Sequence, residues 1–229
     1  MAKQKLMYGH CYFVFDLDEE DDEVTLLQYV EDDTKFKVIE IPDFVTDFTR
    51  PFDLIRQNLK VIYKGLSVSS MDSLFYGYRG NKLDLSEFNT YGVSDMSKMF
   101  SNCEYLTDLD LSNFDTSDVK IMSNMFFDCG LLKSLNISSF DTSNVVNTSN
   151  MFNGCEVLRK LDLGNFNTSN VTNMESMFER CYILSELNIS NFNTEKVENM
   201  SSMFSGCQKL KTIDLSSFST KNVKDMYKI

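Results

Sequence analysis

Five of the six cysteines recur with a 26-residue period, and thiols in such a register could form a disulfide ladder or bind a metal ion. An odd number cannot all pair, and zinc-binding cysteines are usually separated by only about two to four residues. Each of these cysteines ends a short apolar segment, where a buried thiol behaves as a small hydrophobic side chain. We therefore predict a column of free cysteines in the core. Its members are Cys103, Cys129, Cys155, Cys181 and Cys207.

A thiol and an imidazole also stand side by side, because the sixth cysteine, Cys11, follows the only histidine, His10. Adjacent residues of a strand point to opposite faces, so we do not expect the two to act as a catalytic pair. A single histidine also excludes Ser-His-Asp triads and histidine-clustered metal sites from the repeated part of the chain.

Two carboxylates follow an apolar segment near the N-terminus, in the sequence FVFDLD. This segment resembles the opening motif of the haloacid-dehalogenase-type phosphatases, which implies Asp16 as nucleophile, Asp18 as general acid–base and Mg²⁺ between them. The Gly-Thr of that motif is Glu19-Glu20 here, so a Mg²⁺-dependent phosphatase is only a remote alternative. The acidic run of residues 16–23 could also bind Ca²⁺, but it lacks the ligand spacing and glycine of an EF-hand loop. We predict a solvated hairpin tip.

The composition argues against most enzymes. Acidic residues number 34 against 22 Lys and Arg, and the net charge of −12 should repel nucleic acid and anionic membranes. Neither phosphate-binding pattern, GxxxxGK[ST] or GxGxxG, occurs. No apolar stretch approaches the roughly 20 residues of a membrane span, and the N-terminus lacks a signal-peptide cleavage site. These observations predict a non-enzymatic protein without cofactors or membrane insertion, cytoplasmic as written.

From residue 83 onward the chain follows a 26-residue period without an insertion, which is typical of stacked-repeat proteins. Each repeat begins with L-x-L, continues through Phe, Thr and Val, and ends with Met-x-x-Met-Phe-x-x-Cys. The first apolar residues are Leu83, Leu109, Leu135, Leu161, Leu187 and Ile213.

One repeat can be interpreted as a strand, a corner and a short helix. L-x-L has the period of a half-buried strand, and apolar residues at i, i+3, i+4 and i+7 form one face of a helix. A side-chain oxygen just before the first Met could cap that helix, except at Ile121. The capping residues are Asp95, Asn147, Asn173 and Asn199. Because helices are wider than strands, we expect the stack to curve with its strands on the concave side.

The repeats of residues 106–129 and 158–181 read LTDLDLSNFDTSDVKIMSNMFFDC and LRKLDLGNFNTSNVTNMESMFERC. They resemble the repeats of the BspA-like leucine-rich repeat proteins, and the resemblance covers about residues 68–229. It implies an α/β, right-handed leucine-rich-repeat-like solenoid of about six 26-residue coils. It also implies a secreted or cell-surface array for adhesion or protein contact. The family motif is mostly scaffold and carries over no catalytic or binding residue.

The two ends differ from the middle. Residues 1–67 are predicted to form a β-rich N-terminal cap, in which FKVI at 36–39 recurs as LKVI at 59–62, which favours shorter, 23-residue coils. Residues 68–229 form the 26-residue array. Ile229 falls where a Met-Phe pair should stand, so the last coil lacks a capping turn. Either the array is truncated there or a partner covers it, and a self-assembling homodimer through that end is the alternative function.

A partner-binding surface should use positions that the stack does not constrain. The outward position before each strand varies in charge, and the position inside L-x-L is nearly always acidic or amide. We predict that a protein partner of unknown identity binds this concave face. The predicted contact residues are Lys82, Asp108, Lys160, Glu186, Asp110 and Asp162. An ordinary solvated face without a partner is the alternative.

Overall fold

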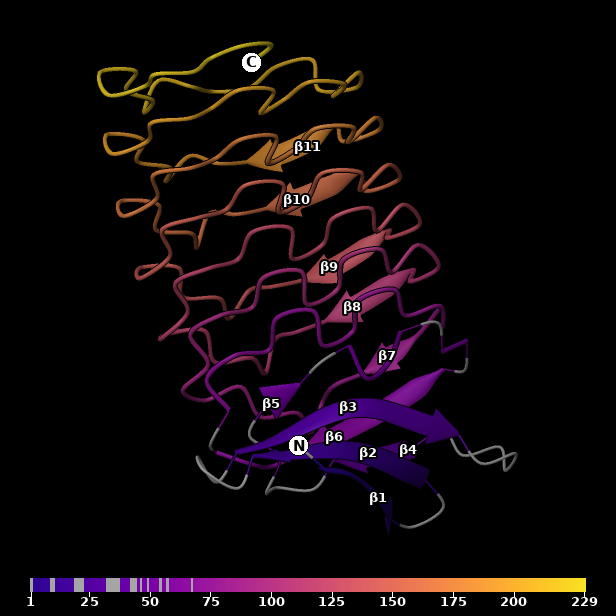
Figure 1. Cartoon of the computed structure of the whole chain (residues 1–229). Coiled ribbons are helices and arrows are strands. Elements are labelled where there is room, and N and C mark those ends of the chain that lie inside the picture. Colours follow the sequence, from indigo (N-terminus) through magenta and orange to yellow (C-terminus); the bar gives the residue numbers. More distant parts are fainter. Residues whose placement is uncertain are drawn as a thin grey trace.

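The computed structural model describes residues 2–8, 11–18, 23–31, 38–41, 45, 47–48, 50–53, 55–56, 58–66 and 68–229. Every helix or strand assigned among them is a β-strand (Figure 1). The repeats lie in layers, one above another, on an N-terminal group of longer strands. No helix able to cross a membrane occurs in these ranges.

The N-terminal sheet consists of β1 (Ala2–Tyr8), β2 (Cys11–Asp18), β3 (Glu23–Glu31) and β5 (Asp47–Phe48), in that spatial order. The first three strands pair antiparallel, and β3 pairs parallel with β5. A β-bulge shifts the β2–β3 register between Val14 and Phe15. All four strands lie within residues 1–67, where the sequence predicts a β-rich region.

A second sheet links this region to the repeats through β4 (Val38–Ile41), β6 (Leu59–Tyr63) and β7 (Leu83–Asp84), all parallel. Ile39 pairs with Val61, whereas the match between FKVI and LKVI aligns it with Ile62. The predicted 23-residue offset is therefore wrong by one position for this pair. A slip of one residue would turn a strand over, and the observed register keeps the Ile39 and Val61 side chains in the core.

The repeats contribute β8 (Asp108–Asp110), β9 (Ser134–Asn136), β10 (Lys160–Asp162) and β11 (Glu186–Asn188). Strand β8 pairs parallel with β9, and β10 pairs parallel with β11. Paired residues in both cases are one 26-residue repeat apart, as the sequence period requires.

The predicted short helix does not form in the described residues. The Met-x-x-Met-Phe-x-x-Cys segments are linked turns, in which the Met99 N–H group donates to the Met96 carbonyl 3.3 Å away. Two residues in a full segment have positive φ, for example 54° at Lys98 and 60° at Asn102. Left-handed residues at this spacing are incompatible with a continuous right-handed helix.

The reason lies in the next repeat. The N–H groups of Met96 and Phe100 donate to the carbonyls of Ile121 and Met125, at 3.0 and 2.9 Å. The same pattern recurs in each later repeat that has a neighbour, as when the Phe152 N–H group donates to the Met177 carbonyl at 2.9 Å. In a helix these N–H groups would donate to carbonyls of the same segment, whereas in the linked turns they donate to carbonyls of the following repeat. The curvature was predicted because helices are wider than strands. The described repeats contain no helix, so this reason for curvature does not apply.

The predicted core columns are buried. The phenylalanine that precedes each cysteine by three residues stacks face to face on its equivalent in the next repeat, with centroids 5.5 to 5.7 Å apart. This stack consists of Phe75, Phe100, Phe126, Phe152, Phe178 and Phe204. Aromatic surface is thus removed from water along the stack, which contributes to stability together with the buried aliphatic side chains.

The corner threonine of each repeat forms two hydrogen bonds with one residue of the next. The Thr142 hydroxyl donates to the Asn167 carbonyl at 3.1 Å and accepts from the Asn167 N–H group at 2.8 Å. Thr142 is 1% exposed, and its hydroxyl serves as the partner of both part-buried backbone groups of Asn167. The predicted corner is therefore a polar connection between neighbouring repeats.

Replacing Thr142 by valine, which has the same shape, should lower the free energy of unfolding by about 1 kcal/mol, because two part-buried backbone groups lose their partner. Urea unfolding measures the difference. Thr220→Val is the matched control, since Thr220 is exposed and should tolerate the change. Equal stability of Thr142→Val and the wild type would contradict a stabilising role for the threonine corner.

Candidate functional site

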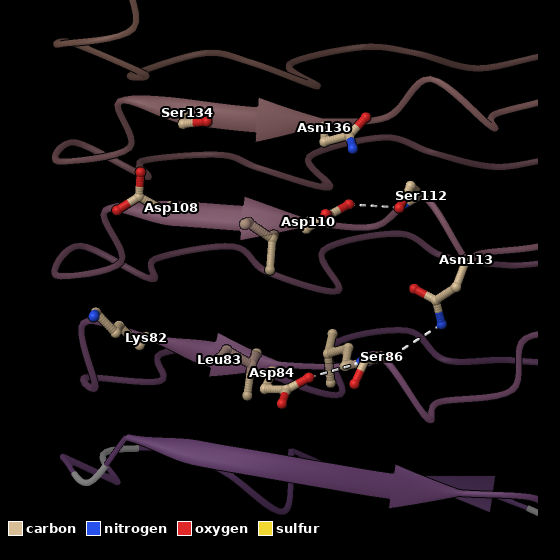
Figure 2. A pocket seen from close by; sticks show the side chains of 12 residues that line it. Lys82, Leu83, Asp84, Ser86, Asp108, Asp110, Ser112, Asn113, Ser134 and Asn136 are labelled. Carbon is tan, nitrogen blue, oxygen red and sulfur yellow. Dashed lines mark hydrogen bonds between the residues drawn. The ribbon is translucent and has the colours of Figure 1, made fainter.

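The outward side of the repeat strands, from Lys82 to Thr212, is called the strand face below. It is hollowed in two places. The first hollow, of about 760 Å³, spans β7 to β9 and contains three predicted residues, Lys82, Asp108 and Asp110 (Figure 2). The second, of about 340 Å³, lies on β10 and β11 and is lined by Lys160, Asp162 and Glu186. The six predicted residues thus fall into two groups of three.

Residues that were not among those six complete the first hollow. Asp84, Ser112, Asn113 and Asn136 also line it, together with Leu109. Leu109 is buried, while the polar side chains around it face solvent. A partner would therefore meet acidic and amide groups above a narrow apolar floor.

The carboxylates inside L-x-L stabilise their own turns. Asp110 accepts the Ser112 N–H group at 2.9 Å, and Asp162 accepts the Gly164 N–H group at 3.0 Å. Hydrogen bonds from the Ser112 N–H group and hydroxyl lower the pKa of the Asp110 carboxyl. The Gly164 N–H group, with the Asn188 amide, lowers the pKa of Asp162. Both groups therefore hold their negative charge at neutral pH and fix the end of the strand.

The mixed column before each strand behaves differently in the two hollows. In the second, the Lys160 ammonium lies 3.3 Å from the Glu186 carboxylate, with both side chains about two-thirds exposed. In the first, the Asp108 carboxylate accepts the Thr107 hydroxyl at 2.8 Å. The first hollow is lined by three carboxylates and one lysine, and the second by two carboxylates and one lysine, of which Lys160 and Glu186 form an ion pair.

The cysteine column lies in the core, as predicted. Each thiol donates to a phenylalanine carbonyl of an earlier repeat, at 3.1 Å from Cys103 to Phe75. All five are free, and burial raises the pKa of Cys103 well above its ordinary value and that of Cys207 to about 11. Protonated buried thiols are poor nucleophiles and poor metal ligands. In the described part of the chain, no group of three or more His, Cys, Asp or Glu could hold a metal ion.

Three predictions concern side chains that the structure does not describe. His10 and residues 19–22 lie outside the described residues, as do the side chains of Cys11, Asp16 and Asp18. The thiol–imidazole pair, the phosphatase motif and the calcium-binding run therefore stay predictions from the sequence.

One ion-pair network was not foreseen. The Arg180 guanidinium lies 2.9 Å from both the Asp128 and the Glu156 carboxylates, so it joins three successive repeats. Gly154 makes room for it, because a Cβ atom there would collide with the Asp128 carboxylate, and its φ is +77°. The same position in three successive repeats is held by Asp128, Gly154 and Arg180. This column of an acid, a glycine and a base is the feature of the sequence that could have predicted the network.

Layers of short parallel strands and linked turns, joined at every repeat, define a stacked-repeat protein. The model of one family, described as Mycoplasma protein of unknown function, DUF285, matches twice in succession, over residues 47–160 and 158–229. The chain belongs to this family, which bears out the predicted repeat family at that coarser level. The match begins before residue 68, so it includes part of the predicted cap. Comparisons with curated proteins and with solved structures give no match.

Arg180→Gln should lower the free energy of unfolding by about 1 kcal/mol, because two carboxylates lose a half-exposed cationic partner. Denaturant unfolding at low salt measures this, and the difference should shrink at high salt. Arg159→Gln is the control, since Arg159 is exposed and forms no ion pair within the described residues. If both variants lose the same stability, the Arg180 network contributes nothing specific.

Proposed function

We propose that the array is a right-handed, leucine-rich-repeat-like solenoid that binds a protein partner through its strand face. The grouping of the six predicted residues around two adjacent hollows carries this proposal. The similarity of the repeats to the BspA-like proteins supports a role in adhesion or protein contact. A fold alone is weak evidence for function, so the proposal has to be tested on the side chains of the strand face.

The backbone beneath the strand face is held in place, which suits recognition. Strand β8 pairs with β9 and β10 pairs with β11, and the turns behind the strands are connected by hydrogen bonds along the whole stack. The outward side chains can therefore vary without altering the frame. Binding to a pre-organised surface loses little conformational entropy on association.

A charge exchange tests the surface without breaking an ion pair. Lys160→Glu combined with Glu186→Lys keeps opposite charges across the two repeats but reverses what a partner meets. A partner captured by the wild-type chain and then purified should bind this variant at least about tenfold more weakly, a loss of about 1.4 kcal/mol. The melting temperature should not change, because exposed pairs contribute little stability.

The matched control is Glu198→Lys with Lys224→Glu. This pair is also exposed and also joins two successive repeats, with 2.8 Å between ammonium and carboxylate, but it lines neither hollow. Its exchange should leave affinity unchanged. Unchanged affinity of the Lys160/Glu186 exchange, or equal losses in both exchanges, would rule out the strand face.

A second candidate function is self-assembly through the last repeat. Four apolar side chains there are between 39% and 67% exposed, a higher concentration than in any earlier described repeat: Leu215, Met226, Tyr227 and Ile229. Contiguous exposed apolar residues mark association surfaces. A second copy that covers them would remove this area from water.

This candidate predicts a mass that rises with concentration in light scattering under reducing conditions. Tyr227→Lys should abolish the rise, because a charge would have to be buried in the contact. Tyr91→Lys is the control, since Tyr91 is similarly exposed but belongs to an earlier repeat. A constant monomer mass for the wild type would exclude self-assembly.

A further inference from the structure

A third hollow lies away from the strand face, at the beginning of the array, and its lining differs in charge from the rest of the protein. It has a volume of about 200 Å³ and is lined by Arg56, Arg79 and Tyr105. Two guanidinium groups and an aromatic ring thus meet in a chain whose net charge is −12. Like charges at close range are unfavourable unless an anion lies between them.

The backbone holds the three side chains near one another. The Arg79 N–H group donates to the Ile55 carbonyl at 2.8 Å, which places Arg79 beside the segment that carries Arg56. The neighbouring Tyr78 strengthens this junction, because its hydroxyl accepts the Leu59 N–H group at 3.2 Å. Backbone hydrogen bonding thus holds Arg79 next to the residue that precedes Arg56.

Tyr105 comes from the repeat after Arg79, and a backbone hydrogen bond joins the two segments. The Thr107 N–H group donates to the Asn81 carbonyl at 3.2 Å, which connects the segment after Tyr105 to the segment after Arg79. Tyr105 is 48% exposed and borders the hollow. Its hydroxyl can donate a hydrogen bond, and its ring can pack against an apolar substituent of a ligand.

The guanidinium groups have no acidic partner in the described part of the chain. The ion pairs found there involve Lys60, Lys160, Arg180 and Lys224, and neither Arg56 nor Arg79 takes part. Both arginines are exposed. In later repeats this position is never basic, so the positive charge is particular to this first repeat; it is held by Glu104, Gly130, Glu156, Tyr182 and Gln208.

We propose that this hollow binds a phosphate group. Arginine presents several N–H donors in a planar fork, and two such forks can bond different oxygens of one tetrahedral, doubly charged anion. A carboxylate carries one charge and two oxygens, so it satisfies the two arginines less completely. This site uses none of the residues that line the hollows of the strand face. The phosphate proposal can therefore be tested independently of partner binding there.

The probe is inorganic phosphate, titrated into the full chain at constant ionic strength and followed by calorimetry. Binding should saturate at one phosphate per chain. Arg56→Gln and Arg79→Gln should each lower the affinity at least about tenfold, because each removes a charge-assisted bidentate contact. Arg79→Lys should recover only part of the affinity, since lysine keeps the charge but loses the fork.

Two controls separate a built site from general attraction. Arg159→Gln removes an exposed arginine that does not line the hollow, and it should bind phosphate as the wild type does. Acetate at the same ionic strength should bind more weakly than phosphate. Absence of saturable binding, equal losses in Arg159→Gln, or acetate affinity equal to that of phosphate would each overturn the proposal. Unchanged thermal unfolding of the variants shows that a loss of binding is not a loss of fold.

Discussion

The hydrogen bonds that run from one repeat to the next are the interaction on which the rest of the structure depends. Alternate N–H groups of the linked turns donate to the following repeat, as from Phe100 to Met125 at 2.9 Å, and the threonine corner adds two more bonds. Each N–H donor requires its carbonyl acceptor at the equivalent position of the following repeat. An inserted residue would shift all the acceptors that follow it in that repeat. The constant 26-residue period, the buried columns and the freedom of the outward positions all follow from this requirement.

Much of the layer could be predicted because its signals are periodic. Apolar columns, the polar corner and the alternation around L-x-L identified the buried and outward residues correctly. The short helix was wrong because apolar residues at i, i+3, i+4 and i+7 also line one side of two linked turns. What decides between the two is the backbone at positions such as Lys98 and Asn102, whose φ is positive. Asparagine is found in the left-handed conformation more often than most residues but less often than glycine, and lysine shows no such preference.

The functional surfaces were predictable only in part, for a related reason. Alternation within a strand places a residue on the outward face, but the division of that face into two hollows depends on contacts between layers. The Arg180 network requires an absent side chain at Gly154, in the repeat between Asp128 and Arg180. The meeting of Arg56 with Arg79 depends on the irregular first repeat, where the 26-residue period does not yet apply. The period aligns Asp128, Gly154 and Arg180 in one column, but it does not reach the irregular first repeat.

Because the connecting bonds point along the stack, the protein should respond to mechanical load differently in different directions. Tension applied between its two ends would act along these bonds and would peel away one layer at a time. Each layer that opens would release one repeat of chain, which can extend by about 90 Å. A stack built in this way should lengthen in steps under load, while the layers that are still closed keep their outward side chains in place.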